Sequence, residues 1–257
     1  MPTYSDFGII LKSFDFSEAD KIFTIYTKTS GLVRAICKGI KKNKSKFSGK
    51  IDQLYCLFLQ FANGRNLDII CEVEQVNCFA KLRESSTRIF YGFLLLDIVN
   101  SFALEGESES SKVYSLLYSS LDKLQDIKYP ELIAIKFTKE FLQIHGFKPQ
   151  FETCVSCSKE LRTQHLEDAC KPFNKHYPYS STLGGLLCKN CADEINHKTV
   201  NTGVLNILES NFEENQDPKD MDRDFNKDIR QTLGLLKDHL NTRAKGEIKT
   251  FDLVFSL

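Results

Sequence analysis

Four cysteines in two C-x2-C pairs are the residues of this chain whose type and spacing point most directly to chemistry. Each pair can place two thiolates on one metal ion, and two such pairs facing each other complete a tetrahedral four-thiolate site for Zn²⁺. The thirty residues between the pairs are expected to fold back as an insertion. We therefore predict one structural zinc ion per chain, with the ligands Cys154, Cys157, Cys188 and Cys191.

Two other states of these cysteines remain open from the sequence: four unpaired thiols in a core, or two disulfides. The total of nine cysteines is odd, and the first residues show no basic segment followed by an apolar one, as a signal peptide would. We therefore expect a cytoplasmic protein with reduced thiols, which favours the metal site. Gly184 and Gly185 precede the second pair, where a tight turn needs a positive φ or a close backbone approach. Cys170, near His165 and His176, is interpreted as a spare cysteine.

Several enzyme classes are disfavoured by the sequence. It contains no G-x-x-x-x-G-K phosphate loop, no H-E-x-x-H and no G-x-S-x-G, and a closed four-cysteine site leaves no position for a reactive water. One enzyme alternative is a zinc deaminase, because His165 and Glu167 followed by the second cysteine pair are similar to the H-x-E…P-C-x-x-C pattern. Leu187 stands where that pattern has proline, and the first cysteine pair would have no role. A second alternative is a zinc ribbon that binds only protein.

The charges of the chain are balanced in number but not in distribution. There are 34 Lys and Arg against 34 Asp and Glu, which argues against a generic nucleic-acid binder. Residues 34–50 nevertheless hold seven basic side chains and no acid, whereas residues 209–224 hold seven acids against two bases. Lysine ammonium groups in an exposed loop bind phosphates without reading base sequence. We predict nucleic-acid contacts, the alternative being a solvated charged loop, by Arg34, Lys38, Lys41, Lys42, Lys44 and Lys46.

The first eighty residues have the pattern of a small β-barrel. Five runs rich in β-branched, aromatic and cysteine residues are separated by turn signals, at 8–14, 21–28, 32–40, 53–61 and 67–79. They favour a closed barrel of OB-like or SH3-like type, which removes exposed edges. The last run alternates, so Leu67, Ile69, Cys71 and Val73 are expected on one face and Ile70 on the other. The basic residues lie between the third and fourth strands, where Phe47 is expected either to stack on a base or to plug the barrel.

From residue 85 onward the pattern becomes helical. Helices are predicted at 88–104, 112–124, 130–145, 202–213 and 225–240, with His145 capping the third at its C-terminus. No apolar run approaches the roughly 18 residues of a membrane span, so no membrane contact is expected. The predicted fold is α+β, with a five-stranded OB-like barrel in residues 1–80. A helical domain follows in residues 81–257 and carries the zinc-binding insertion at about 150–198.

The order of these parts resembles the RecO family of bacterial recombination mediators. The resemblance rests on the barrel with its loop at 38–45 (KGIKKNKS), the helical body, the inserted cysteine pairs, and Gly184 and Gly185 ahead of the second pair. The opening residues 8–11 and 18–20, with the turn from Thr27 to Gly31, are similar to the first two strands of that family. The resemblance covers nearly the whole chain, except that the acidic stretch 209–224 has no place in the family pattern.

The resemblance implies a non-enzymatic protein of DNA repair and recombination. RecO proteins bind single- and double-stranded DNA and anneal complementary strands. They engage the C-terminal tail of single-stranded-DNA-binding protein and pair with RecR to help load RecA. Carried onto this chain, the resemblance implies that the loop lysines hold backbone phosphates, that the zinc is structural, and that the protein is cytoplasmic and associated with the bacterial nucleoid.

Overall fold

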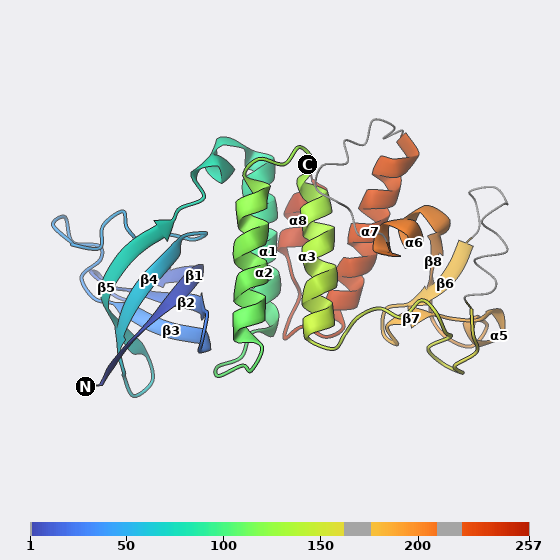
Figure 1. Ribbon diagram of the computed structural model, residues 1–257, viewed down its shortest axis with the longest axis horizontal. Helices are drawn as coiled ribbons and strands as arrows, with labels where there is room; N and C mark the ends of the chain where they lie inside the picture. The colour runs from blue at the N-terminus through green and yellow to red at the C-terminus, as the bar shows by residue number, and fades with distance from the viewer. Residues whose placement is uncertain (1, 162–175, 210–222, 257) are drawn as a thin grey trace. The chain divides into compact units, whose positions relative to one another are not determined.

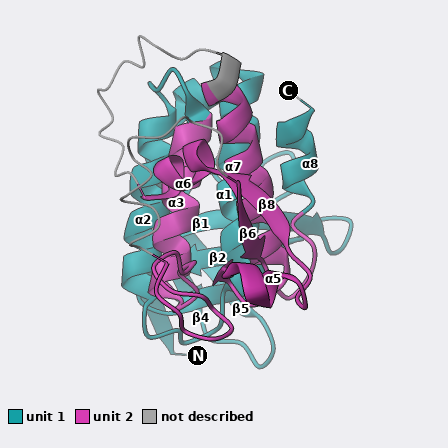
Figure 2. Cartoon of the chain, turned by 90° about the vertical axis from the view of Figure 1, so that its right-hand side faces the viewer, with its two compact units in different colours: residues 1–130, 249–257 teal, residues 131–248 magenta. Residues whose placement is uncertain are grey.

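A computed structural model describes residues 2–161, 176–209 and 223–256. Contacts between residues divide the chain into two compact units: unit 1 comprises residues 1–130 and 249–257, and unit 2 comprises residues 131–248 (Figure 2). The division that the sequence places at residue 80 remains a prediction, and these units group the helices that follow the barrel with the barrel itself. Cys170, His165, Glu167 and most of the acidic stretch 209–224 lie outside the described residues.

Unit 1 begins with a closed five-stranded barrel (Figure 1). Its strands are β1 (Thr3–Asp15), β2 (Lys21–Thr27), β3 (Gly31–Cys37), β4 (Cys56–Ala62) and β5 (Asp68–Asn77). They pair in the order β1-β2-β3-β5-β4, and β4 closes the barrel against β1. Every pairing is antiparallel except that of β3 with β5. This order is that of an OB-like barrel, so the predicted fold class is confirmed and the SH3-like option is closed.

Side chains from all five strands fill the barrel, but β5 departs from the predicted alternation. Ile70, expected on the outer face, is 2% exposed and belongs to the barrel core. The reason is a register shift between Gln60 and Phe61 of β4, opposite which β5 carries an extra residue. Such a bulge turns the following side chains over, and Val73 packs against the same core further along. The expectation of a regular alternation along this strand is therefore wrong.

Helices pack against the barrel within unit 1. These elements are η1 (Ala80–Glu84), α1 (Ser86–Phe102), α2 (Ser110–Leu124) and α8 (Thr250–Phe255). Asp97 of α1 connects three elements, because one carboxylate oxygen lies 2.9 Å from Nζ of Lys12 on β1 and the other accepts a hydrogen bond from Thr250 of α8. The Tyr114 hydroxyl of α2 lies 3.1 Å from the Cys56 sulfur of β4. The C-terminal helix and the barrel thus belong to one packed unit.

Unit 2 combines helices with a small antiparallel sheet. Its elements are α3 (Pro130–Ile144), β6 (His176–Ser180), β7 (Gly185–Leu186), α5 (Lys189–Ala192), β8 (Lys198–Asn201), α6 (Thr202–Glu209) and α7 (Arg223–Asn241). The strand β6 lies between β7 and β8, and α6 packs against α7. His145 follows α3, with Nδ1 2.9 Å from the Phe141 carbonyl oxygen, at the expected capping position. Among all the residues that the structure describes, no helix is both long enough and apolar enough to cross a membrane.

A buried histidine joins α7 to the sheet of unit 2. His239 is fully buried, with Nδ1 2.7 Å from the Tyr179 hydroxyl of β6 and Nε2 2.8 Å from the Phe147 carbonyl oxygen. This arrangement suits a neutral ring, in which Nε2–H donates to the carbonyl and Nδ1 accepts from the hydroxyl. Burial lowers the pKa of His239 to about 4, and the positive charge of Arg243 acts in the same direction, whereas the bond to Phe147 opposes the shift.

We expect the free energy of unfolding to decrease as the pH is lowered from about 6.5 towards 4. The folded-state pKa of His239 is depressed, so in this window the unfolded state binds more protons, and the loss saturates below the folded pKa. His239→Gln should remove this part of the pH dependence, roughly 2–3 kcal/mol. Urea unfolding of parent and variant across the pH range measures the difference, and parallel curves for the two proteins would contradict the assignment.

Candidate metal centre and nucleic-acid interface

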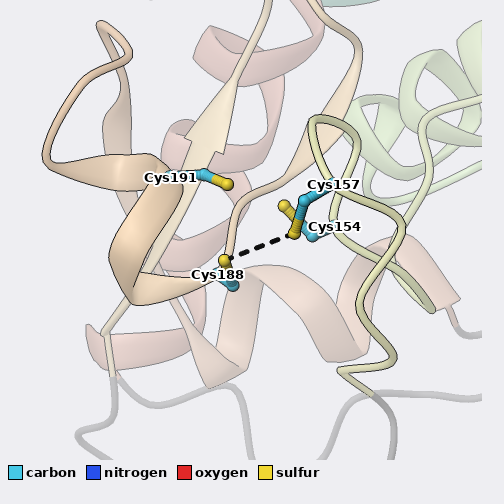
Figure 3. A group of neighbouring side chains, drawn as sticks. All are labelled: Cys154, Cys157, Cys188 and Cys191. Atoms are coloured by element: carbon cyan, nitrogen blue, oxygen red, sulfur yellow. Dashed lines mark hydrogen bonds between the residues drawn. The ribbon is translucent and has the colours of Figure 1, made fainter.

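The two cysteine pairs come together in unit 2 (Figure 3). The sulfur atoms of Cys154, Cys157, Cys188 and Cys191 all lie within 4.8 Å of one another, and those of Cys157 and Cys188 are 3.7 Å apart. In a tetrahedral site with Zn–S bonds of about 2.3 Å, neighbouring sulfurs are about 3.8 Å apart. The described cysteines are all free thiols, so the structure does not contain the two-disulfide alternative. The four sulfurs are close enough together to bind one shared metal ion.

Backbone hydrogen bonds shape the turn that carries the first pair. The Cys154 N–H donates to the Lys159 carbonyl at 2.8 Å, and the Ser158 N–H donates to the Cys154 carbonyl at 2.9 Å. Ser158 completes the turn with a positive φ of 61°. The Val155 N–H donates to the Leu186 carbonyl at 2.9 Å, which ties this turn to β7. The first pair is therefore held by a turn that the sheet itself anchors.

The second pair lies at the start of the single-turn helix α5. Cys188 is its N-cap residue and Cys191 lies within the turn, where the Ala192 N–H donates to the Cys188 carbonyl at 3.0 Å. Figure 3 shows the two pairs facing each other from α5 and from the turn that follows α3. Cys154 and Cys188 are buried whereas Cys157 is exposed, so the cluster lies at the surface of unit 2.

Hydrogen bonds and neighbouring sulfurs shift the pKa values of the cluster thiols in opposite directions. Burial opposes ionisation of Cys154, but backbone N–H groups, that of Cys188 first, outweigh it and lower the pKa of Cys154 to about 6. Hydrogen bonds from Cys191 also lower the pKa of Cys188. The hydrogen bond with Ser156 favours the Cys191 thiolate, but the neighbouring thiols and burial together outweigh it and raise the pKa of Cys191 to about 12. Thiolates are the metal-binding form, and four of them in this space require a positive charge among them.

The shared cluster bears on the deaminase alternative. In that alternative only the second cysteine pair binds the metal, together with His165, and the first pair has no role. The structure instead brings both pairs into one site. His165 and Glu167 lie outside the described residues. The observed cluster therefore favours a closed four-cysteine site.

Two glycines let β7 approach the first cysteine turn. Gly184 has a φ of +86°, which confirms the expected positive φ ahead of the second pair. A Cβ on Gly185 would lie 2.4 Å from the Gln150 carbonyl oxygen and 2.5 Å from Cγ1 of Val155. Gly185 and Gln150 also form a β-bridge. The close approach is therefore to the chain around the first pair, and not to the sulfurs.

The predicted phosphate-binding residues lie on unit 1, on β3 and on the segment that follows it. We call residues 38–50 the basic loop. All six predicted residues and Lys50 are exposed, with Arg34 on β3 and the others in the basic loop. Phe47 is instead 7% exposed and belongs to the barrel core together with Ile51. Of the two expectations for Phe47, the plug is confirmed and the base-stacking role is wrong.

The basic loop is exposed but anchored at both of its ends. The Lys41 N–H donates to the Ala19 carbonyl at 3.0 Å in the β1–β2 turn. Gly39 has a φ of +70°, and its N–H donates to the Asp20 carboxylate in the same turn at 2.7 Å. On β5, the side-chain amide of Gln75 donates to two carbonyl oxygens of the loop at 3.2 Å. The loop thus presents its side chains from a held backbone.

The basic side chains fall into two groups. Nζ of Lys41 is 3.1 Å from the Asp15 carboxylate and donates to the Ser17 carbonyl at 2.8 Å. Nζ of Lys46 donates to the Cys71 carbonyl at 2.9 Å. No salt bridge or side-chain hydrogen bond within the described ranges engages the other five, which are Arg34, Lys38, Lys42, Lys44 and Lys50. These five cationic groups are available to an anionic partner.

The β1–β2 turn is a neighbour of the basic loop that was not predicted from the sequence. Phe14 and Phe16 lie at the end of β1 and in this turn and are 44% and 60% exposed. The Phe-x-Phe pattern before Ser17 could have indicated an exposed apolar surface at this turn, since two large apolar residues beside turn-forming polar ones are unusual for a solvated loop.

Comparison with known families gives two consecutive matches. The family described as "Recombination protein O N terminal" matches residues 1–79, which contain the barrel, and "Recombination protein O C terminal" matches residues 83–209. Relatives named "DNA repair protein RecO" include one from Rubrobacter xylanophilus, 28% identical over 76% of this chain and 73% of the relative. Others come from Moorella thermoacetica, 30% identical over 72% and 64%, and Desulforamulus reducens, 31% identical over 75% and 70%.

Gly185→Ala is expected to destabilise the protein by about 1–3 kcal/mol, because the new Cβ would force Gln150 and Val155 away from β7. Gly234→Ala in α7 is the matched control, since nothing lies within 4 Å of a Cβ there. Alanine should stabilise that helix by up to about 1 kcal/mol. Chemical denaturation of both variants measures the two effects, and a Gly185→Ala protein as stable as its parent would rule out the close approach.

Proposed function

This chain belongs to the RecO family of DNA repair proteins, since the two family matches together cover most of its length, and we propose that it acts as a recombination mediator. In this role it binds single- and double-stranded DNA without sequence specificity and anneals complementary strands. It also helps RecR to load RecA on DNA coated with single-stranded-DNA-binding protein. RecR and the C-terminal tail of that protein are its direct partners, RecA is an indirect one, and the role is non-enzymatic and cytoplasmic.

The observation that carries the DNA-binding part is the group of five available cationic side chains on an OB-like barrel. Barrels of this type bind oligonucleotides on one face and through neighbouring loops. A cation that has no protein partner can meet a phosphate without first breaking a salt bridge, and each such contact releases counterions from the DNA. Charges of this kind hold the backbone of any sequence equally. This is the behaviour that a repair protein acting along the whole genome requires.

We further propose that Cys154, Cys157, Cys188 and Cys191 hold one structural Zn²⁺. The spacing of the four sulfurs and their thiol chemistry fit this ion. Zinc bound there supplies the positive charge that several thiolates need and a cross-link between two turns of unit 2. Four protein ligands leave no coordination position for water, so these residues serve stability and not a reaction.

Cys157→Ser is expected to abolish most zinc binding and to destabilise unit 2, because a hydroxyl is a poor ligand for this ion. Elemental analysis of the purified protein measures the metal, and hydrogen exchange reports the stability of each unit separately. Amides of the barrel should keep their protection. Cys78→Ser, which changes a thiol outside the cluster, is the control and should retain zinc. Full zinc content in Cys157→Ser would refute the ligand assignment.

Lys42→Glu/Lys44→Glu is expected to weaken DNA binding, because it reverses two available charges of the basic loop. If all five available groups contact phosphate, log K for a single strand should fall with log salt at a slope of about −3.5, and the variant should lower that magnitude by at least about 1.4. Lys148→Glu/Lys227→Glu makes the same charge change at exposed sites of unit 2 and is the control. Fluorescence anisotropy of labelled oligonucleotides across a salt series measures both.

Annealing tests the mediator function with the same proteins. The parent and the unit 2 control should accelerate annealing of complementary oligonucleotides coated with single-stranded-DNA-binding protein, whereas the basic-loop variant should not. Failure of the parent to bind or anneal DNA would refute the proposal and favour the zinc ribbon that binds only protein. Equal activity of all three would place the DNA site elsewhere on the chain.

A further inference from the structure

Phe14 and Phe16 are unusual among the apolar residues of unit 1. Phe16 is 60% exposed, more than any other large apolar side chain in the described part of the chain, and Phe14 is 44% exposed. A single exposed apolar residue is common, but two phenylalanines at alternate positions, one at the end of β1 and one in the turn after it, form a local apolar surface. Neither ring contacts another aromatic ring among the described residues, whereas Phe7 on the same strand packs against Phe58 at 5.0 Å.

The turn that carries these rings is fastened to the basic loop. Lys41 reaches it twice, since its N–H donates to the Ala19 carbonyl at 3.0 Å and its Nζ donates to the Ser17 carbonyl at 2.8 Å. The Gly39 N–H donates to the carboxylate of Asp20, the last residue of the turn, at 2.7 Å. The phenylalanines and the loop lysines therefore belong to neighbouring segments of the barrel surface, which these hydrogen bonds hold together.

The charges around the turn suit a polyanion. The carboxylate of Asp15, between the two phenylalanines, lies 3.1 Å from Nζ of Lys41 and 3.8 Å from Nζ of Lys21, so its negative charge is offset. The Asp20 carboxylate accepts the Gly39 N–H. Glu18 is the remaining acid of the turn, and its single negative charge is smaller than the positive charge of the six lysines in the basic loop. The apolar surface thus has a cationic border on the side of the loop.

We propose that Phe14 and Phe16 form a platform on which unpaired bases of single-stranded DNA stack, while the lysines of the basic loop hold the adjoining phosphates. In OB-type barrels the loop between the first two strands is one of the segments that contact oligonucleotides. Aromatic rings beside a positively charged groove bind bases of any sequence through their faces. Phe47, the other aromatic residue of this region, is buried and cannot take that part.

The phenylalanines and the loop lysines would then differ in whether they distinguish single-stranded from duplex DNA. Bases in a duplex are already stacked on each other, so the phenylalanines interact only with single strands, whereas phosphates are present in both. This inference rests on the proposed DNA binding and adds to it a preference for single-stranded segments. It also predicts that losing the rings lowers single-strand affinity without changing the slope of its salt dependence, because no charge is removed.

The absence of tryptophan from the chain offers a direct probe. Phe16→Trp introduces a single indole, whose emission should be quenched when oligo(dT) is added and should remain unchanged with a blunt duplex of the same length. Anisotropy of labelled DNA in the same samples reports binding independently. DNA binding without any change in indole emission would overturn the platform while leaving the proposed function intact. Absence of binding by the parent protein would overturn both.

Phe14→Leu/Phe16→Leu tests the energetic contribution, because leucine keeps an apolar side chain and removes the aromatic ring. Single-strand affinity should fall at least roughly tenfold, as expected for the loss of one stacked base, and duplex affinity should stay within about twofold. Leu104→Ala, which alters another exposed apolar residue of unit 1 at 56% exposure, should change neither. An equal loss of affinity for both forms of DNA, or no loss for either, would refute the platform.

Discussion

The parallel pairing of β3 with β5 is the constraint on which the proposed interface depends. Because β5 occupies the place beside β3, the chain that leaves β3 must cross the barrel and return as β4, next to β1. Residues 38–55 make this crossing. A hairpin would need only two to five residues. Phe47 and Ile51 are buried in the barrel core along the way, and the lysines between them and β3 remain in solvent. The same segment that completes the barrel therefore also presents the positive charge.

Different interactions stabilise unit 1 and unit 2, each within itself. The barrel of unit 1 has a continuous apolar core, so substitutions of exposed charges there should leave its stability largely unchanged. The sheet of unit 2 has strands of only two to five residues, which bury little apolar area by themselves. Other local contacts hold this sheet to the rest of unit 2: the cysteine cluster, the close backbone approach at Gly185, and the neutral His239 between Tyr179 and Phe147. Unit 2 should consequently respond to metal removal and to acid more strongly than the barrel.

The proposed DNA interface uses interactions that do not depend on base sequence. Phosphate contacts by available lysines and stacking on exposed rings both act on any strand, and neither requires a helix placed in a groove. The four-cysteine cluster lies in the other unit, where the proposed structural zinc ion would provide stability without reactivity. Such a division suits the proposed role, in which the protein binds and anneals DNA strands.

The sequence by itself determined the features that depend on neighbouring residues. The C-x2-C spacing identified the cysteine cluster. Runs of β-branched and aromatic residues between turn signals identified the barrel strands, and a period of 3.6 residues identified the long helices. The run of lysines identified the basic loop. Only the tertiary structure decided the barrel type, because strand order depends on pairing between distant segments. It also decided that Lys41 is paired with Asp15 while Lys42 is available, and that Phe47 is buried while Phe16 is exposed. Both phenylalanines lie in polar segments. Their exposure differs because the segment around Phe47 packs over the barrel core and the β1–β2 turn does not, and no local sequence pattern encodes that contact.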